Sequence, residues 1–75
     1  MNNERRKRIR YANELLNSAK TIVNKVMDDE QNAFDNLSDG LQQTRRGEQM
    51  EDNIDTLQEV IDKIEEVIDL MDDIE

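Results

Sequence analysis

Apolar side chains recur at intervals of three and four residues through the first half of the chain. The series begins at Ile9 and ends at Leu37, with the polar Glu30 in its course. Its apolar or small members are Ile9, Ala12, Leu16, Ala19, Val23, Val26, Ala33 and Leu37. Steps that alternate between three and four place side chains on one face of an α-helix. The pattern therefore predicts a first helix over about residues 3–36.

The second half is more regular, with three consecutive seven-residue units at 54–60, 61–67 and 68–74. Each unit begins with Ile-Asp, carries Leu or Ile or Met at its fourth place, and ends on Val or Ile. A two-stranded coiled coil needs only the first and fourth places apolar, whereas a third apolar place is typical of bundle helices. The units predict a second helix over about residues 45–74. Their wide stripe favours a homodimer that forms a four-helix bundle.

Residues 37–44 predict a turn between the two helices. Gly40 suits a left-handed position after a helix end, and Thr44 suits the cap of the second helix. A connection this short fits an antiparallel pair. The predicted fold is all-α, an antiparallel two-helix hairpin like a coiled coil, and one continuous helix is the main alternative. The expected helix-packing stripe consists of Leu16, Val23, Ile54, Leu57, Ile61, Ile64 and Ile68.

Composition limits the chemistry available to this chain of 75 residues. Cysteine and histidine are both absent, which excludes disulfides and Cys/His metal sites, so no metal and no cofactor is expected. No apolar run exceeds two residues, so no membrane span is expected, and the basic start lacks the apolar core of a signal peptide. We therefore expect a cytoplasmic protein.

Charge is divided between the two ends. The net charge is −9, yet residues 4–10 hold five bases against one acid, while residues 48–75 hold twelve acids against Lys63. The basic cluster consists of Arg5, Arg6, Lys7, Arg8 and Arg10. In a hairpin it would approach Asp69, Asp72, Asp73 and Glu75 and relieve unfavourable helix-dipole placements at both ends. Alternatively, the basic end overhangs and meets a second chain.

Several familiar motifs fail on inspection. The segment from Asp35 to Gly40 resembles a calcium-binding EF-hand loop, but Leu37 and Arg46 stand where oxygen ligands are needed. A basic helix-loop-helix would need a longer basic helix, and the acidic second helix would repel DNA phosphates, which argues against direct nucleic-acid binding.

Glu30 is the acid that lies within the apolar series of the first helix, and it is expected to pair with Arg45 or Arg46 across the turn. No pair of a nucleophile and a general base is visible in the sequence. We expect no enzymatic activity.

The acidic face of the second helix has the most specific functional interpretation. Its candidate residues are Asp55, Glu59, Asp62, Glu65, Glu66, Asp69 and Asp72. Carboxylates spaced regularly along a rigid helix can imitate a phosphate backbone and bind a basic protein surface. The simpler alternative is that these charges serve only solubility.

Residues 29–37 (Asp-Glu-Gln-Asn-Ala-Phe-Asp-Asn-Leu), then Leu41-Gln42, Arg46-Gly47-Glu48, Met50-Glu51 and the Ile-Asp repeats form a recognisable pattern. Together with the basic start, it resembles small proteins of bacteriophages and mobile elements in Gram-positive bacteria. Those proteins often carry Pro-Glu-Ser where this chain has Ser38-Asp39-Gly40. The family is largely without assigned function, so the resemblance implies a setting inside a bacterial host and no activity.

Three hypotheses follow from the sequence. The first is a phage-type inhibitor or regulator whose acidic helix binds a basic surface on a host protein, as an anti-defence or anti-CRISPR protein would, by analogy only. The second is a structural or assembly protein that acts by helical self-association through the apolar stripes. The third is a weak nucleic-acid binder that uses the basic cluster.

Overall fold

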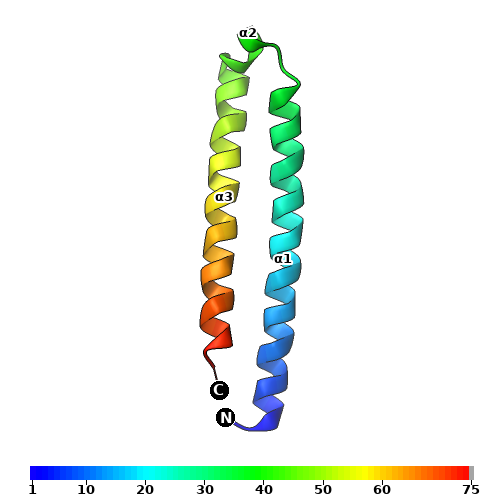
Figure 1. The fold of residues 1–75 in the computed structure, drawn as a ribbon, viewed down its shortest axis with the longest axis vertical. Coiled ribbons are helices and arrows are strands. Elements are labelled where there is room, and N and C mark those ends of the chain that lie inside the picture. The colour runs from blue at the N-terminus through cyan, green and yellow to red at the C-terminus, as the bar shows by residue number, and fades with distance from the viewer. Residues whose placement is uncertain (75) are drawn as a thin grey trace.

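The computed structural model describes residues 1–74, which form three helices. These are α1 (Asn3–Asp35), α2 (Asp39–Gln42) and α3 (Arg45–Asp72), and the described residues contain no strand. The two long helices lie side by side with α2 at one end and both termini at the other (Figure 1). The molecule measures 59 × 15 × 12 Å along its principal axes. This all-helical arrangement is consistent with a hairpin, and the region predicted as a turn contains the short α2.

Three polar contacts link the long helices at successive levels. Nδ2 of Asn13 donates to Oδ1 of Asp72 at 3.0 Å, and Nζ of Lys20 lies 3.0 Å from Oε1 of Glu65. Near the turn, Nδ2 of Asn53 donates to Oε2 of Glu30 at 3.3 Å. Residue numbers therefore rise along α1 as they fall along the facing part of α3.

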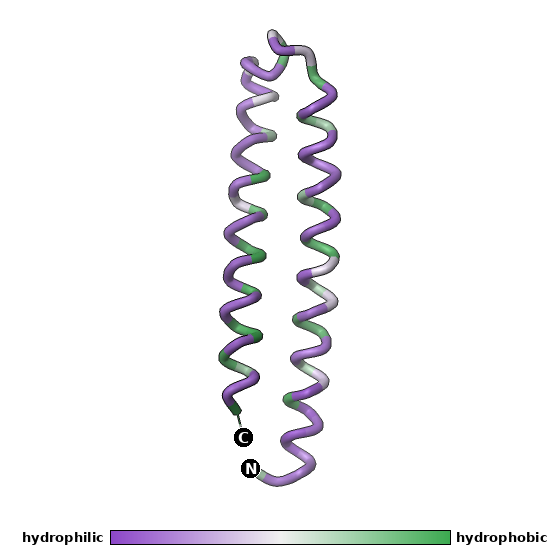
Figure 2. Tube along the Cα trace, viewed as in Figure 1, coloured by the Kyte–Doolittle hydropathy of each residue, from purple (hydrophilic) through white to green (hydrophobic). Residues whose placement is uncertain are grey.

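The α3 side of the helix contact follows a strict heptad. Its buried and half-buried residues are Gly47, Met50, Ile54, Leu57, Ile61, Ile64, Ile68 and Met71. Figure 2 shows the corresponding hydrophobic bands recurring on the side of α3 that faces α1. Ile61, at 3 % exposure, is the only apolar side chain in residues 1–74 that is buried. The hairpin thus has a narrow core.

The α1 side of the contact differs from the predicted series. Ala19, Val26 and Ala33 were expected in the contact but are exposed, and the half-buried residues beside them are Lys20, Met27 and Phe34. The half-buried residues of α1 that step by four and three are Ile9, Asn13, Leu16, Lys20, Val23, Met27, Glu30 and Phe34, and Leu37 continues the series beyond the helix end. Ala12, which the sequence predicted in the contact, is half-buried as well, as is Asn24. The predicted and the observed series share every seventh residue, beginning with Ile9. Between these shared residues the observed series steps by four and then three, whereas the predicted series steps by three and then four. All seven residues of the expected packing stripe are half-buried or buried.

Side chains cap each helix start. Oδ1 of Asn2 accepts from the backbone N–H of Arg5 at 2.9 Å, and Oγ of Ser38 accepts from that of Leu41. Thr44 caps α3 as predicted, since its Oγ1 accepts from the N–H of Gly47 at 3.4 Å. The expectation for Gly40 is wrong: no glycine has a positive φ, and Gly40 lies within α2. The chain turns through the capped α2 and does not need a left-handed residue.

Replacing Thr44 with alanine is expected to destabilise the protein by about 0.5–2 kcal/mol, the usual cost of losing a helix cap. The hydroxyl of Thr44 also donates to the carbonyl of Leu41, so the same change loosens the link between α2 and α3. Urea denaturation followed by circular dichroism measures the effect. Thr44→Ser keeps the hydroxyl and should lie within a few tenths of a kcal/mol of the original protein. Equal losses in both variants would contradict a capping role.

Candidate functional site

The residues that directly follow the α3 contact residues form a continuous acidic strip. They are Glu48, Glu51, Asp55, Gln58, Asp62, Glu65, Asp69 and Asp72, and all are exposed. Each lies about 100° around the helix from the contact residue before it, so all project along the same side of α3. We call this set the acidic edge. Seven of its eight members are carboxylates.

The acidic edge contains five of the seven acidic residues that the sequence singled out. The other two, Glu59 and Glu66, are turned toward the opposite side of the hairpin. Glu59 lines a groove there together with Lys63, and Oε2 of Glu66 lies 3.5 Å from Nζ of the same Lys63. Sequence reasoning missed Glu48 and Glu51. The signal was present, because both positions continue the heptad backwards by seven residues from Asp55 and Gln58.

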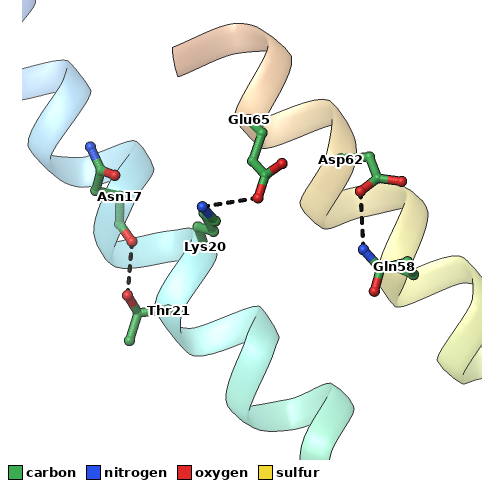
Figure 3. Close-up of polar contacts among 6 residues, drawn as sticks. All are labelled: Asn17, Lys20, Thr21, Gln58, Asp62 and Glu65. Atoms are coloured by element: carbon green, nitrogen blue, oxygen red, sulfur yellow. Dashed lines mark hydrogen bonds and ion pairs between the residues drawn. The ribbon is translucent and has the colours of Figure 1, made fainter. Parts of the chain in front are cut away.

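Some carboxylates of the acidic edge are held in place by neighbours. Glu65 contacts Lys20 of α1, and Oδ1 of Asp62 accepts from Nε2 of Gln58 at 3.0 Å (Figure 3). Asp72 accepts from Asn13. Within residues 1–74, Asp55 and Asp69 take part in no side-chain hydrogen bond or ion pair. Their charges therefore remain available to a partner.

The remainder of this side of the molecule is polar but less charged. The close-up in Figure 3 places Asn17 and Thr21 of α1 on the same side as Asp62 and Glu65, with the hydroxyl of Thr21 donating to the carbonyl of Asn17 at 3.1 Å. Asn13 lies deeper in the contact, and its Oδ1 is buried without a hydrogen-bond partner. This side therefore offers carboxylates from α3 and mainly neutral polar groups from the middle of α1.

The basic cluster does not form the cross-helix ion pairs that the sequence suggested. In the described residues, none of its members lies within ion-pair distance of Asp69, Asp72 or Asp73, and Glu75 falls outside those residues. The reason is register, because Asn13 rather than Arg10 stands opposite Asp72. Arg6 and Arg10 instead line a cavity of about 260 Å³ with Ile9, Asn13, Met71, Asp72 and Ile74.

The predicted pairing of Glu30 with Arg45 or Arg46 is also wrong. Glu30 accepts from Asn53, which lies two turns further along α3 than the two arginines. The inserted α2 moves the start of α3 away from the level of Glu30. Glu30 is thus a polar member of the helix contact that is satisfied by an amide.

The opposite side of the hairpin carries several large exposed apolar side chains, with Thr56 and Lys63 among them on α3. The residues that directly precede contact residues there include Leu15, Ala19, Ile22, Val26, Val60, Val67 and Leu70, and all seven are exposed. We call this set the apolar edge. Leu16, Ile64, Val60 and Val67 line a groove of about 320 Å³ between the helices, with Thr56, Glu59 and Lys63 at its margin. The hairpin therefore has two unlike long sides.

Comparisons of the chain with protein-family models, with curated proteins and with solved structures give no significant match. Within residues 1–74, no three carboxylates lie close enough to hold a metal ion. None of the helices described is long and apolar enough to cross a membrane.

Proposed function

We propose that the protein is a non-enzymatic binding protein that folds as an antiparallel helical hairpin and contacts a basic protein surface through its acidic edge. The observation that carries this proposal is the row formed by Asp55, Asp62 and Asp69. The three carboxylates recur every seven residues on one side of α3, about 10 Å apart, on a helix that is supported by α1 along this length.

Rigidity and charge both support this role. A helix that is already folded before binding does not lose conformational freedom in the complex, so less of the interaction energy is spent on ordering. The carboxylates on one edge create a directional negative field that accelerates encounter with a positive surface. Cross-helix contacts hold Glu65 and Asp72 in position, while Asp55 and Asp69 remain free to pair with a partner.

The resemblance to proteins of phages and mobile elements favours a bacterial host protein as the target. A regular row of carboxylates suits a groove that ordinarily binds a nucleic-acid backbone, because such grooves present lysine and arginine. We therefore propose inhibition or regulation of a host nucleic-acid-binding protein, of the anti-defence kind, by mimicry of the nucleic acid.

The triple variant Asp55→Asn, Asp62→Asn and Asp69→Asn is expected to bind its partner more weakly while keeping its helicity. Losing three exposed charge contacts of about 0.5–1 kcal/mol each corresponds to a dissociation constant that is roughly 10- to 100-fold larger. The tagged protein is first used to capture partners from a bacterial lysate at low salt. A captured protein is then purified and titrated against each variant by calorimetry.

The matched control removes three negative charges from outside the acidic edge, as Glu4→Gln, Asp29→Asn and Asp73→Asn. It should bind within about twofold of the original protein if position matters, and it should follow the triple variant if only net charge matters. A partner that binds all three proteins equally well would show that the acidic edge is not the binding surface.

A second candidate function rests on the apolar edge. Ile22 and Leu70 are 64 % and 67 % exposed, which is unusual for large apolar side chains that recur at helical spacing. A structural or assembly protein that acts through self-association would use this side and would tolerate neutralisation of the acidic edge. Full function of the Asp55, Asp62 and Asp69 variant would favour this second candidate.

A further inference from the structure

The apolar edge spans both helices on one side of the hairpin. Each of its members directly precedes a contact residue, whereas each member of the acidic edge directly follows one. In an antiparallel pair, the positions that precede the contact on the two helices lie on the same side. Leu15, Ile22 and Val26 of α1 therefore lie on the same side of the hairpin as Val60 and Val67 of α3, where Leu16, Val60 and Val67 line a groove.

The hairpin alone has little to stabilise it. Ile61 is the one buried apolar side chain among residues 1–74, and three members of the α1 contact series are the polar residues Asn13, Lys20 and Glu30. Chains of this size ordinarily gain only about 3–5 kcal/mol from a core, and association is one of the ways in which they gain further stability. Covering the apolar edge would therefore stabilise the folded protein.

The spacing of the apolar edge suits a copy of itself. On α1 its residues follow the three-and-four spacing that packs helix against helix, whereas on α3 Val60, Val67 and Leu70 are separated by steps of seven and three, with Lys63 at the intervening position. Two copies of such a surface can face each other about a two-fold axis, which is the commonest symmetry of protein dimers. Two such edges facing each other bury apolar residues from four helices and leave both acidic edges on the outside.

Charge selects the relative direction of the two copies. Residues 3–10 carry five bases and one acid, a net charge of +4, and Asn13 already stands opposite the last residue of α3. The start of α1 thus extends roughly two turns past the end of α3. At the other end of the hairpin, residues 28–52 hold eight acids against Arg45 and Arg46, a net charge of −6.

We propose that the apolar edge is covered by the apolar edge of a second copy packed head to tail, so that the basic segment of each copy lies against the turn end of the other. The reverse orientation would place two +4 segments together and two −6 ends together. Like charges brought together at the ends of the dimer oppose association, whereas the head-to-tail pairing adds attraction at both ends.

This inference does not depend on the partner proposed for the acidic edge, because it uses the opposite side of the hairpin. It does give that proposal a consequence. The dimer carries two acidic edges on opposite outer sides, so it can occupy two basic surfaces at once.

Ile22→Asp is expected to separate the dimer into monomers. Sedimentation equilibrium over a range of concentrations should give twice the 8.8 kDa chain mass for the original protein and a dissociation constant at least about a hundredfold higher for the variant, because an unpaired carboxylate would be buried. Ser18→Asp adds the same charge one turn away and outside the apolar edge, and it should remain dimeric. A monomeric original protein, or equal behaviour of the two variants, would overturn the proposal.

Orientation is tested separately with one spin label per chain at Gln43→Cys, an exposed position beside α2. Head-to-tail packing places the two labels at opposite ends, with a separation that approaches the 59 Å length of the hairpin. Labels near the roughly 10 Å spacing of adjacent helices would show the reverse orientation and overturn the proposal. A DNA duplex that binds the dimer at low salt, and no longer binds Arg5→Glu/Arg8→Glu, would show that the basic segment is free and would likewise overturn its docking.

Discussion

Replacing Ile61 with alanine is expected to remove most of the stability of the protein. Ile61 is 3 % exposed and lies at the middle of the α3 contact series. Truncation of a buried isoleucine to alanine costs about 2–5 kcal/mol, through lost transfer energy and the cavity left behind. That range is comparable with the whole stability available to a core of this size. Thermal unfolding followed by circular dichroism should show a large fall in melting temperature.

A graded series separates this effect from a general sensitivity of the chain. Ile61→Val removes one methylene and should cost about 0.5–1.5 kcal/mol. Leu41→Ala deletes as many carbon atoms as Ile61→Ala, but Leu41 in α2 is 52 % exposed and should lose well under half as much. If Leu41→Ala were as damaging as Ile61→Ala, the core would not be where the structure places it.

The second long helix could be predicted from sequence because its pattern is unambiguous. Isoleucine opens each of three successive heptads and an apolar residue stands at each fourth place, so only one choice of contact face buries all of them. The cap at Thr44 was predictable for a similar reason, since a threonine hydroxyl has a defined local partner at a helix start. Local chemistry decides both features.

The contact face of the first long helix could not be predicted in the same way. Apolar side chains lie on both sides of the line through Ile9, Leu16 and Val23, so two contact series were open. The structure half-buries Lys20 rather than Ala19, and Lys20 pairs there with Glu65 of α3. That choice depends on the register between the two long helices, which the insertion of α2 sets. The periodicity within one helix carries no information about this register.

The same limitation explains the errors in the predicted charge pairs. The contacts of Asn13 with Asp72 and of Glu30 with Asn53 are fixed by register, and the sequence offered arginines near both sites. The acidic edge escaped this problem, because its members are related by heptad spacing within α3 alone. The direction of the two long helices places the acidic edge and the apolar edge on opposite sides of the hairpin. Binding and self-association can therefore be tested independently.

Replacing Gly47 with alanine is expected to destabilise the protein although alanine is the better helix former. Gly47 is buried in the first turn of α3, where a Cβ would lie 2.6 Å from the carbonyl carbon of Gln42 and 2.8 Å from its Cα. Backbone atoms cannot rotate away as a side chain can, so α2 must move from α3. Overpacking of this kind costs about 1–3 kcal/mol, which exceeds the roughly 1 kcal/mol gained in helix propensity over most of that range.

Gly40→Ala provides the matched control, because a Cβ there meets nothing within 4 Å and the backbone of Gly40 is not left-handed. This change should stabilise the protein by about 0.4–1 kcal/mol, through a smaller conformational entropy of the unfolded chain. Urea denaturation of the two variants should therefore give shifts of opposite sign. Stabilisation by both alanines would mean that α2 does not pack on the start of α3, and that the register of the hairpin is set by some other contact.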